Sequence, residues 1–216
     1  MAGRHAVRAF LPTPIARATI EDILTVARRA PSGTNLQPWR VHVLSGAARQ
    51  RLVDAVCAAY DADEPGHEPE CDYYPAEFFE PYLSRRRAIG LGLYGLLGIA
   101  KGDAARMRAQ MRRNYEFFGA PVGLIFSIDR RMGRGGWLDY GTFLQNVMLA
   151  AGARGLDTCP QVAWLPYHRI IAGQLGFAAQ EQLVCGMCVG HADPDAVENT
   201  LATARAALDE FVVFHG

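Results

Sequence analysis

The segment that most limits how this chain can fold is WLDYGTFLQNVMLAAGARG, residues 137 to 155. Its larger apolar side chains recur at helical spacing and spread over more than one face; they are Leu138, Phe143, Leu144, Val147, Met148 and Ala151. A helix that is apolar on several faces must be covered on several sides, by its own core or by another subunit. The rest of the fold, or a second copy of the chain, is therefore expected to enclose this helix.

Further helices are predicted where apolar residues stand three and four positions apart. These segments are residues 19 to 31, 51 to 60, 85 to 118 and 166 to 177. Thr19 is a candidate N-cap for the first helix, which should stop at Pro31. The third segment should break into two helices near Gly102 and Asp103.

Strands are predicted by short apolar or alternating runs. They are WRVHVL (39 to 44), APVGLIFSI (120 to 128), LDTC (156 to 159), LVCGMCVGHA (183 to 192) and a last strand in ALDEFVVFHG (207 to 216). Four or five strands among dominant helices indicate the α+β class. With 216 residues and no internal repeat, the chain should form one domain, residues 1 to 216.

Composition excludes several function classes. Lys plus Arg equals Asp plus Glu at 22 each, so no basic surplus supports nucleic-acid binding. The sequence has no apolar run of about 18 residues and no signal peptide, so we expect a cytoplasmic protein without a membrane role. The six histidines lack metal-binding spacing, and no metal is expected.

Two short motifs invite functional readings that their surroundings do not support. Cys185 and Cys188 form a CxxC, but it lies inside a predicted buried strand, which favours packing over redox chemistry. The segment GLGLYG, Gly90 to Gly95, matches G-x-G-x-x-G. A dinucleotide site needs a strand before that motif, whereas YLSRRRAI is helical in period, so close helix packing is the better interpretation.

Residues 61 to 82 are acidic, rich in proline and aromatic. Loops of this length are uncommon unless they act as lids or are disordered. The aromatic residues Tyr73, Tyr74, Phe78 and Phe79 favour a lid that packs on another group, with disorder as the alternative.

Four separated segments, in this order, together resemble the signatures of the nitroreductase family of FMN-dependent oxidoreductases. They are RHAVRAF (4 to 10), APSGTNLQPW (30 to 39), GLDTCPQVAW (155 to 164) and ATARAALDEFV (202 to 212). The resemblance implies a nitroreductase-like α+β homodimer in which helices surround a central, mostly antiparallel sheet of four to five strands. It also implies two FMN sites at the dimer interface and a domain-swapped C-terminal segment that reaches across the partner.

The first and last segments would hold the FMN phosphate. Arg4 and Arg8, with His5 between them, can make charge-assisted bonds to phosphate oxygens. By the resemblance, Arg205 is a further phosphate-binding residue. Many relatives have a serine where this chain has Ala6, which leaves only a main-chain donor there. The alternative is that these arginines are solvated surface charges in an arginine-rich chain.

The second segment would reach the flavin from the partner subunit. The resemblance assigns Pro31, Ser32, Gly33 and Asn35 to it, with Gln37 as a neighbour. Gly33 would allow close main-chain approach, while Ser32 and Asn35 offer hydrogen bonds. A helix C-cap followed by a turn would explain Pro31 to Gly33 but not the polar residues that continue to Gln37.

The third segment would pass beside the flavin ring. By the resemblance, Pro160 and Gln161 belong to the cofactor site, and the main-chain amides of Val162 and Ala163 face flavin N5 and O4. Trp164 could face the substrate or lie in the core.

The family resemblance implies an FMN-dependent NAD(P)H oxidoreductase that reduces a small aromatic acceptor, nitroaromatic or quinone-like. Its mechanism would be ping-pong hydride transfer through flavin N5, with NADH and NADPH both open as donors. A flavin carries the chemistry, so no catalytic side chain is required. The alternatives are a flavin-binding or sequestering protein without significant turnover and another reaction of the same fold, such as reductive dehalogenation. Phe117 and Phe118 could stack over the substrate, but core packing is the favoured role.

Overall fold

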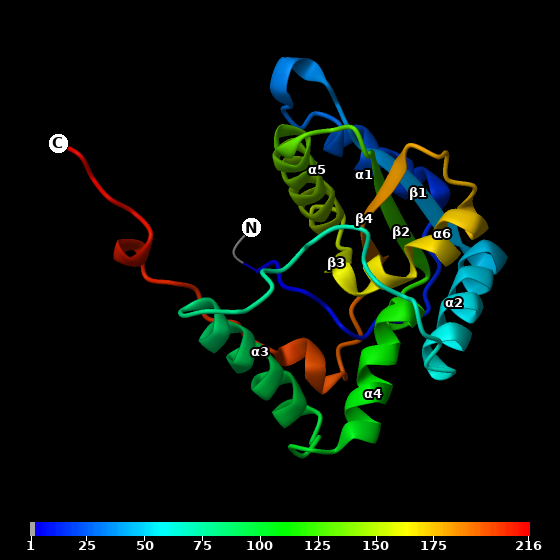
Figure 1. Ribbon diagram of the computed structural model, residues 1–216, viewed down its shortest axis with the longest axis vertical. Coiled ribbons are helices and arrows are strands. Elements are labelled where there is room, and N and C mark those ends of the chain that lie inside the picture. The colour runs from blue at the N-terminus through cyan, green and yellow to red at the C-terminus, as the bar shows by residue number, and fades with distance from the viewer. Residues whose placement is uncertain (1–2) are drawn as a thin grey trace.

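The computed structural model describes residues 3 to 216 and contains one antiparallel sheet with helices on both faces (Figure 1). The sheet order is β1-β2-β4-β3. Its strands are β1 (Arg40–Ser45), β2 (Val122–Asp129), β3 (Asp157–Gln161) and β4 (Glu181–Gly190). The predicted α+β class and antiparallel sheet are confirmed.

The two central strands read as apolar runs because both of their faces are covered. Seven of the eight residues of β2 are buried, and nine of the ten residues of β4 are buried. The register places Ile125 opposite Gly186. A Cβ at Gly186 would lie 2.5 Å from the indole of Trp164, so this close approach requires glycine.

Helices α1 (Arg17–Ala27) and α5 (Arg134–Gly152) cover one face of the sheet. Helices α2 (Gly46–Asp61) and α6 (His168–Leu175) cover the other, with the 3₁₀ segments η2 (Arg113–Gly119) and η3 (Val162–Tyr167). The predicted apolar helix is therefore α5, and its buried residues Phe143 and Val147 pack in the same cluster as Leu124 and Phe126 of β2.

Helices α3 (Tyr82–Leu96) and α4 (Ala104–Arg112) lie to one side of the sheet (Figure 1). The predicted break near Gly102 and Asp103 is confirmed, since Asp103 is the N-cap of α4 and accepts a hydrogen bond from the Arg106 N–H at 3.1 Å. Gly90 to Gly95 lie inside α3, which confirms that they are not a dinucleotide-binding turn.

Two expectations are wrong, one about where the first helix begins and one about a last strand. Helix α1 begins at Arg17 with Ala16 at its N-cap, so Thr19 lies within the first turn and is not the cap. The predicted last strand is absent, because residues 201 to 216 extend away from the body and include only a 3₁₀ turn, η5 (Leu208–Glu210). No strand of the described sheet lies beside them to provide main-chain partners.

The CxxC lies in β4, as predicted, and its cysteines point to opposite faces of the sheet. An odd separation along a strand has this result, and Cys185 and Cys188 fall in different core clusters. Burial raises the pKa of Cys185 to about 12 and that of Cys188 well above its usual range. Both cysteines therefore act as apolar core residues.

Within residues 3 to 216, no helix has the length and hydropathy needed to span a membrane. The same residues contain no cluster of three or more His, Cys, Asp or Glu side chains suited to a metal ion.

Candidate functional site

The first motif lies along the edge of β3. Ala6 forms a parallel bridge with Thr158. The side chain of Asn199 accepts hydrogen bonds from the N–H groups of Arg8 at 2.8 Å and Ala9 at 3.1 Å, and it donates to the Ala9 carbonyl at 2.8 Å. Asn199, which our sequence analysis did not single out, thus fixes the N-terminal segment beside the sheet through both ends of its amide.

Two cavities flank Arg4 and His5. The first, of about 600 Å³, is also lined by the end of α5 and the start of β3, including Met148, Leu149, Gly152, Asp157 and Thr158. The second, of about 410 Å³, is lined by residues 199 to 203 and by Arg205. The structure therefore brings Arg4, His5 and Arg205 together from opposite ends of the chain. Ala6 and Arg8 line neither cavity, and Nη1 of Arg8 turns back to the Ala6 carbonyl at 3.4 Å.

Arg4 and Arg205 have no carboxylate partner among the described residues. Nη1 of Arg4 donates to the Met148 sulfur at 3.8 Å. Nη1 of Arg205 donates to the Thr203 hydroxyl at 2.6 Å and to the carbonyls of Thr203 and Ala204, each at 3.0 Å. The remaining guanidinium donors can form charge-assisted bonds to an anion in these cavities.

The third motif follows β3 into η3. Gln161 has an extended conformation, with φ −136° and ψ 111°, and serves as the N-cap of η3. Val162 and Ala163 are the first two residues of η3, and N–H groups at this position have no partner within a helix. Neither donates to a main-chain carbonyl elsewhere in residues 3 to 216. Both residues are partly exposed, as is typical of donors that serve a ligand.

The side chain of Gln161 is not free for a ligand. Its Nε2 donates to the Asn114 carbonyl at 2.7 Å, and its Oε1 accepts from Trp164 Nε1 at 3.2 Å and from the Cys188 thiol at 3.1 Å. A cofactor contact at Gln161 is therefore left to its main chain. Pro160, by contrast, is exposed.

The aromatic candidates lie in the core. Trp164 is fully buried, and its ring centroid lies 4.5 Å from that of Phe117. Phe118 is also buried in the same cluster. The favoured core role of the two phenylalanines is confirmed, and of the two roles left open for Trp164 the structure supports packing.

The thiol nearest the first motif is Cys159 of β3. Burial raises its pKa to about 11, which outweighs the opposite effect of the nearby Arg8 and Arg4 side chains. Cys159 is therefore an uncharged thiol at neutral pH and is not a candidate nucleophile.

The second motif forms an exposed loop with unusual main-chain conformations. Thr34, Asn35 and Gln37 all have positive φ, at 49°, 62° and 49°. Such residues cost free energy and concentrate at functional sites. The loop is held by internal bonds, including one from the Gln37 N–H to the Ser32 hydroxyl at 3.0 Å.

In the ribbon of one chain, this loop lies well away from the N-terminal segment (Figure 1). It contacts the amino-terminal half of α5, where the Gly33 N–H donates to Asp139 at 3.0 Å and the Thr142 hydroxyl donates to the Pro31 carbonyl at 3.2 Å. Met148, which contacts Arg4, is six residues further along α5 than Thr142, or about 9 Å along the helix axis at 1.5 Å per residue. Pro31, Ser32, Gly33, Asn35 and Gln37 line neither cavity.

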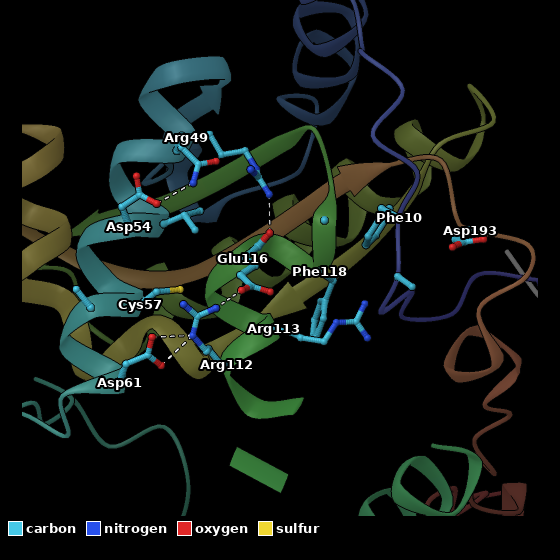
Figure 2. Close-up of a pocket in the computed structure, with 15 residues that line it drawn as sticks. Phe10, Arg49, Asp54, Cys57, Asp61, Arg112, Arg113, Glu116, Phe118 and Asp193 are labelled. Carbon is cyan, nitrogen blue, oxygen red and sulfur yellow. Dashed lines mark hydrogen bonds and ion pairs between the residues drawn. The ribbon is translucent and has the colours of Figure 1, made fainter. Parts of the chain in front are cut away.

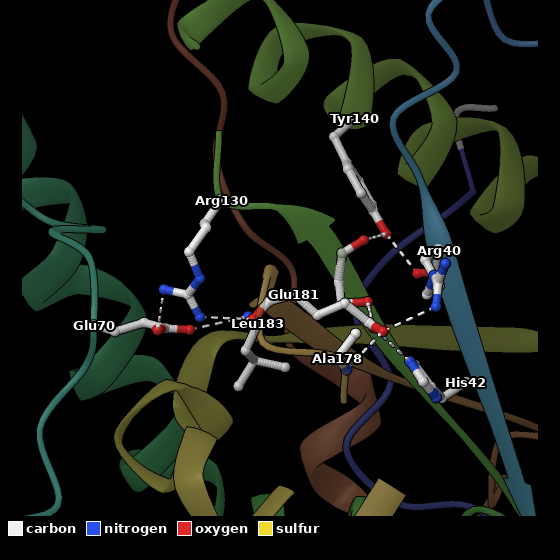
Figure 3. Close-up of polar contacts among 9 residues, drawn as sticks. Arg40, His42, Glu70, Arg130, Tyr140, Ala178, Glu181 and Leu183 are labelled. Carbon is white, nitrogen blue, oxygen red and sulfur yellow. Dashed lines mark hydrogen bonds and ion pairs between the residues drawn. The ribbon is translucent and has the colours of Figure 1, made fainter. Parts of the chain in front are cut away.

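The predicted lid segment is ordered against β4 and α3. Glu70 accepts a hydrogen bond from the Leu183 N–H at 3.3 Å and pairs with Arg130 at 3.2 Å (Figure 3). Arg86 of α3 lies over the Phe78 ring, 4.4 Å from its centroid. The aromatic residues of the segment line neither cavity, so a role as a lid stays a prediction.

Comparison with known proteins gives a consistent result. A family profile described as "Nitroreductase family" matches residues 1 to 191. The chain is 43% identical over 216 residues to 4-nitrobenzoate reductase of Pseudomonas putida, covering 100% of this chain and 94% of that protein. It is 41% identical over 211 residues to nitrobenzene nitroreductase of Ectopseudomonas oleovorans, covering 98% and 93%.

Solved structures agree with these sequence matches. The fold matches an FMN and NADPH-dependent nitroreductase, NfnB from "sphigopyxis sp. strain HMH", with a TM-score of 0.96 and 41% identity over 100% of this chain and 96% of that one. It also matches the FMN-dependent NfnB of Mycobacterium smegmatis in complex with NADPH, with a TM-score of 0.93 and 33% identity over 99% and 95%.

Proposed function

Because the chain belongs to the nitroreductase family, we propose that it uses bound FMN to reduce nitroaromatic or quinone-like acceptors with electrons from NADH or NADPH. The protein is an oxidoreductase of the nitroreductase type, and its FMN- and NADPH-dependent structural neighbours support this cofactor pair. The observation that carries the proposal is the meeting of Arg4 and Arg205 at one cavity without carboxylate partners. One nitroreductase-like domain, residues 1 to 216, would hold the cofactor.

The residues present fit the phosphate of FMN. A phosphate near charge −2 needs cationic donors that are not already neutralised, and Arg4 and Arg205 meet that need. His5 lines the same two cavities. Arg8 lines neither cavity, so we propose a smaller contribution from its side chain.

The η3 amides fit the polar edge of the flavin ring. We propose that the Val162 N–H donates to N5 and that the Ala163 N–H lies toward O4, because both donors start a helix and find no main-chain acceptor within residues 3 to 216. The chemistry that bound FMN supplies is transfer of a hydride equivalent from NAD(P)H to an electron-poor acceptor. Val162 and Ala163 would orient the ring, and donor and acceptor would use its open face in turn, as in a ping-pong mechanism.

A homodimer explains where the second motif acts. The loop from Pro31 to Gln37 contacts the amino-terminal half of α5, whereas Arg4 contacts Met148 in its carboxy-terminal half. We therefore propose that the partner's loop completes each site. The C-terminal segment supports the same assembly, because residues 3 to 216 of its own chain leave Phe211 and Phe214 68% and 85% exposed. We propose that this segment is exchanged between subunits.

The proposed location is the reducing cytoplasm, where thiols stay unpaired. It fits the five cysteines, all of which are free.

The first test is the visible spectrum of the purified protein and chromatography of its released chromophore. We expect FMN, and we expect NAD(P)H oxidation to accelerate when a nitroaromatic such as 4-nitrobenzoate is added. Recovery of FAD or of no flavin would reject the cofactor assignment. A yellow protein that oxidises NAD(P)H no faster with any acceptor would instead support a flavin-sequestering role.

A further inference from the structure

Gln161 places a buried polar side chain where β3 turns into η3. It is the last residue of β3 and the N-cap of η3, and only 3% of it is exposed. An N-cap side chain commonly accepts a hydrogen bond from the first turn of its helix, but that of Gln161 makes no such bond. Its amide is used elsewhere, directly before the main-chain donors of Val162 and Ala163.

The hydrogen-bonding capacity of this amide is fully used. Nε2 donates to the Asn114 carbonyl at 2.7 Å and to the Asn114 Oδ1 at 3.4 Å. Oε1 accepts from Trp164 Nε1 at 3.2 Å and from the Cys188 thiol at 3.1 Å. A side-chain amide has two N–H donors and two acceptor positions, so none is left for a ligand. Gln161 therefore ties the end of β3 to η2, η3 and β4 at once.

The bond to Trp164 spans the two residues that carry the proposed flavin donors. Gln161 and Trp164 stand on either side of Val162 and Ala163, so their side-chain bond closes a short loop over that pair. The indole has little room to move, because it is fully buried and a Cβ at Gly186, the register partner of Gln161, would lie 2.5 Å from it. With both ends held, the direction of the Val162 and Ala163 N–H groups is fixed.

The segment that supplies the Asn114 acceptor is itself anchored. Figure 2 shows Arg112, which precedes η2, between Asp61 of α2 and Glu116 of η2. Its Nε donates to both carboxylate oxygens of Asp61, at 2.8 and 2.9 Å, and its Nη1 pairs with Glu116. Nη2 of Arg49, also from α2, donates to the Glu116 carbonyl. Helix α2 therefore holds η2, and with it Asn114, through contacts that do not involve Gln161.

We propose that Gln161 is a positioning residue for the flavin, whose buried amide holds the start of η3 so that the Val162 and Ala163 N–H groups face N5 and O4. This inference rests on the proposed function, because it requires that those two amides meet bound FMN. Stability alone does not call for an amide here, since replacing buried hydrogen-bond partners by apolar groups of the same shape can be nearly neutral. A fixed direction of the two donors does call for one.

The first variant is Gln161→Met, which keeps an unbranched side chain and removes the amide. Misdirected N5 and O4 donors should raise the FMN dissociation constant of the full chain about 5- to 10-fold in a fluorescence titration, the equivalent of about one neutral hydrogen bond. Tyr140→Phe is the matched control. Tyr140 is also buried and donates to two main-chain carbonyls, at 2.8 and 3.0 Å, but it packs in the core cluster on the other face of the sheet. Both variants should lower stability in urea, and the control should leave the FMN affinity unchanged.

A second variant, Gln161→Glu, tests the donor directly. Its uncharged carboxyl group can donate to the Asn114 carbonyl and accept from Trp164 and Cys188, as the amide does, whereas the ionised carboxylate cannot donate. Burial should hold the pKa of this introduced carboxyl above about 4.3, the usual value of a glutamate. The FMN affinity is taken relative to that of the natural sequence at each pH, so that titration of the FMN phosphate cancels. This ratio should return toward one as the pH falls through the raised pKa, while the ratio for Gln161→Met should not change with pH.

Two results would overturn the proposal. They are an FMN affinity of Gln161→Met equal to that of Tyr140→Phe, or a Gln161→Glu ratio that follows that of Gln161→Met at every pH. If Gln161→Met fails to fold, Gln161→Glu decides alone, because it compares two protonation states of one protein. A natural protein that binds no FMN would reject the proposed function and this inference together, whereas equal affinities in an FMN-binding protein would reject only the role of Gln161.

Discussion

Replacement of Glu181 by glutamine should destabilise the fold in a pH-dependent way. Glu181 begins β4, its side chain is only 6% exposed, and its carboxylate is the centre of a polar cluster (Figure 3). Oε1 accepts from Arg40 at 2.9 Å and from the Ala178 N–H at 3.1 Å, while Oε2 contacts His42 at 3.2 Å and the Ser127 hydroxyl at 2.8 Å. The cluster joins β1, β2 and β4 at one end of the sheet.

The magnitude follows from which contacts glutamine can keep. Its oxygen can replace Oε1, and its NH₂ can face Ser127 and His42, both of which can accept a hydrogen bond. Geometry is then retained and charge is lost, so each bond falls from roughly 1.5–3 to roughly 0.5–1.5 kcal/mol. Arg40 is 62% exposed, so its ion pair adds little. The other three contacts each lose about 1–1.5 kcal/mol, which gives a loss of about 3–4.5 kcal/mol in the free energy of unfolding.

The sign of the pH dependence follows from the pKa of Glu181. Burial alone would raise it, but hydrogen bonds from Ala178, Ser127 and His42 and the charge of Arg40 outweigh burial and lower the pKa. The stabilisation is therefore complete above the unfolded pKa, about 4.3 for a glutamate, and is lost as the pH falls through the lower folded value. The difference between the natural sequence and Glu181→Gln should shrink over that acidic range.

The assay is urea unfolding at equal protein concentration, at pH 7 and at steps below pH 4. Glu21→Gln is the control, because Glu21 and its partner Arg17 are 58% and 92% exposed. It should change stability by no more than about 0.5 kcal/mol. The reasoning fails if Glu181→Gln matches this control at pH 7, or if its deficit stays constant to the lowest pH at which both proteins fold.

Three further outcomes test the proposed flavin site. Arg205→Ala should weaken FMN binding by about 1.5–3 kcal/mol in a fluorescence titration. The control Arg28→Ala, which changes an exposed arginine of another region, should leave FMN binding unchanged. Equal affinities of the two variants would show that Arg205 is only a surface charge. Arg4→Ala and Asn35→Ala should each be inactive alone yet regain part of the activity when mixed, because mixed dimers contain one intact site; no recovery after verified subunit exchange would place each site within one chain. Val162→Pro should still bind FMN but should slow its reduction, followed by stopped-flow bleaching, far more than Val162→Ala does. Proline fits the first position of η3 and the extended conformation of Gln161 before it, but it lacks the N–H. Equal rates at equal FMN content would exclude this amide as the N5 partner.

Much of the local structure was predictable because the pattern of apolar residues along the sequence follows which faces of a helix or strand are buried. The run APVGLIFSI gave a strand because β2 is covered on both faces, and the many-sided apolar pattern of residues 137 to 155 gave α5. The motifs also indicated the nitroreductase family, and the family profile covers the first three of the four.

Other features depend on contacts that leave no periodic signal. Gln161 appears polar and available in the sequence, yet Asn114 and Cys188 from distant segments and Trp164 from the next turn occupy its side chain. Residues 207 to 216 have the composition of a strand, but a strand needs a neighbour, and the described chain provides none beside them. Strand propensity is a property of the segment, whereas pairing is a property of its surroundings.

The sequence by itself determined which segments become helices and central strands and which motifs the chain carries, because those follow from side-chain spacing and residue type. Only the tertiary structure decided which charges are free. Within residues 3 to 216, Arg4 and Arg205 meet without carboxylate partners, whereas Arg112 is neutralised by Asp61 and Glu116. In a chain with 22 basic and 22 acidic residues, composition cannot separate these cases. Whether a charge is available depends on which distant groups the fold places within a few ångströms of it.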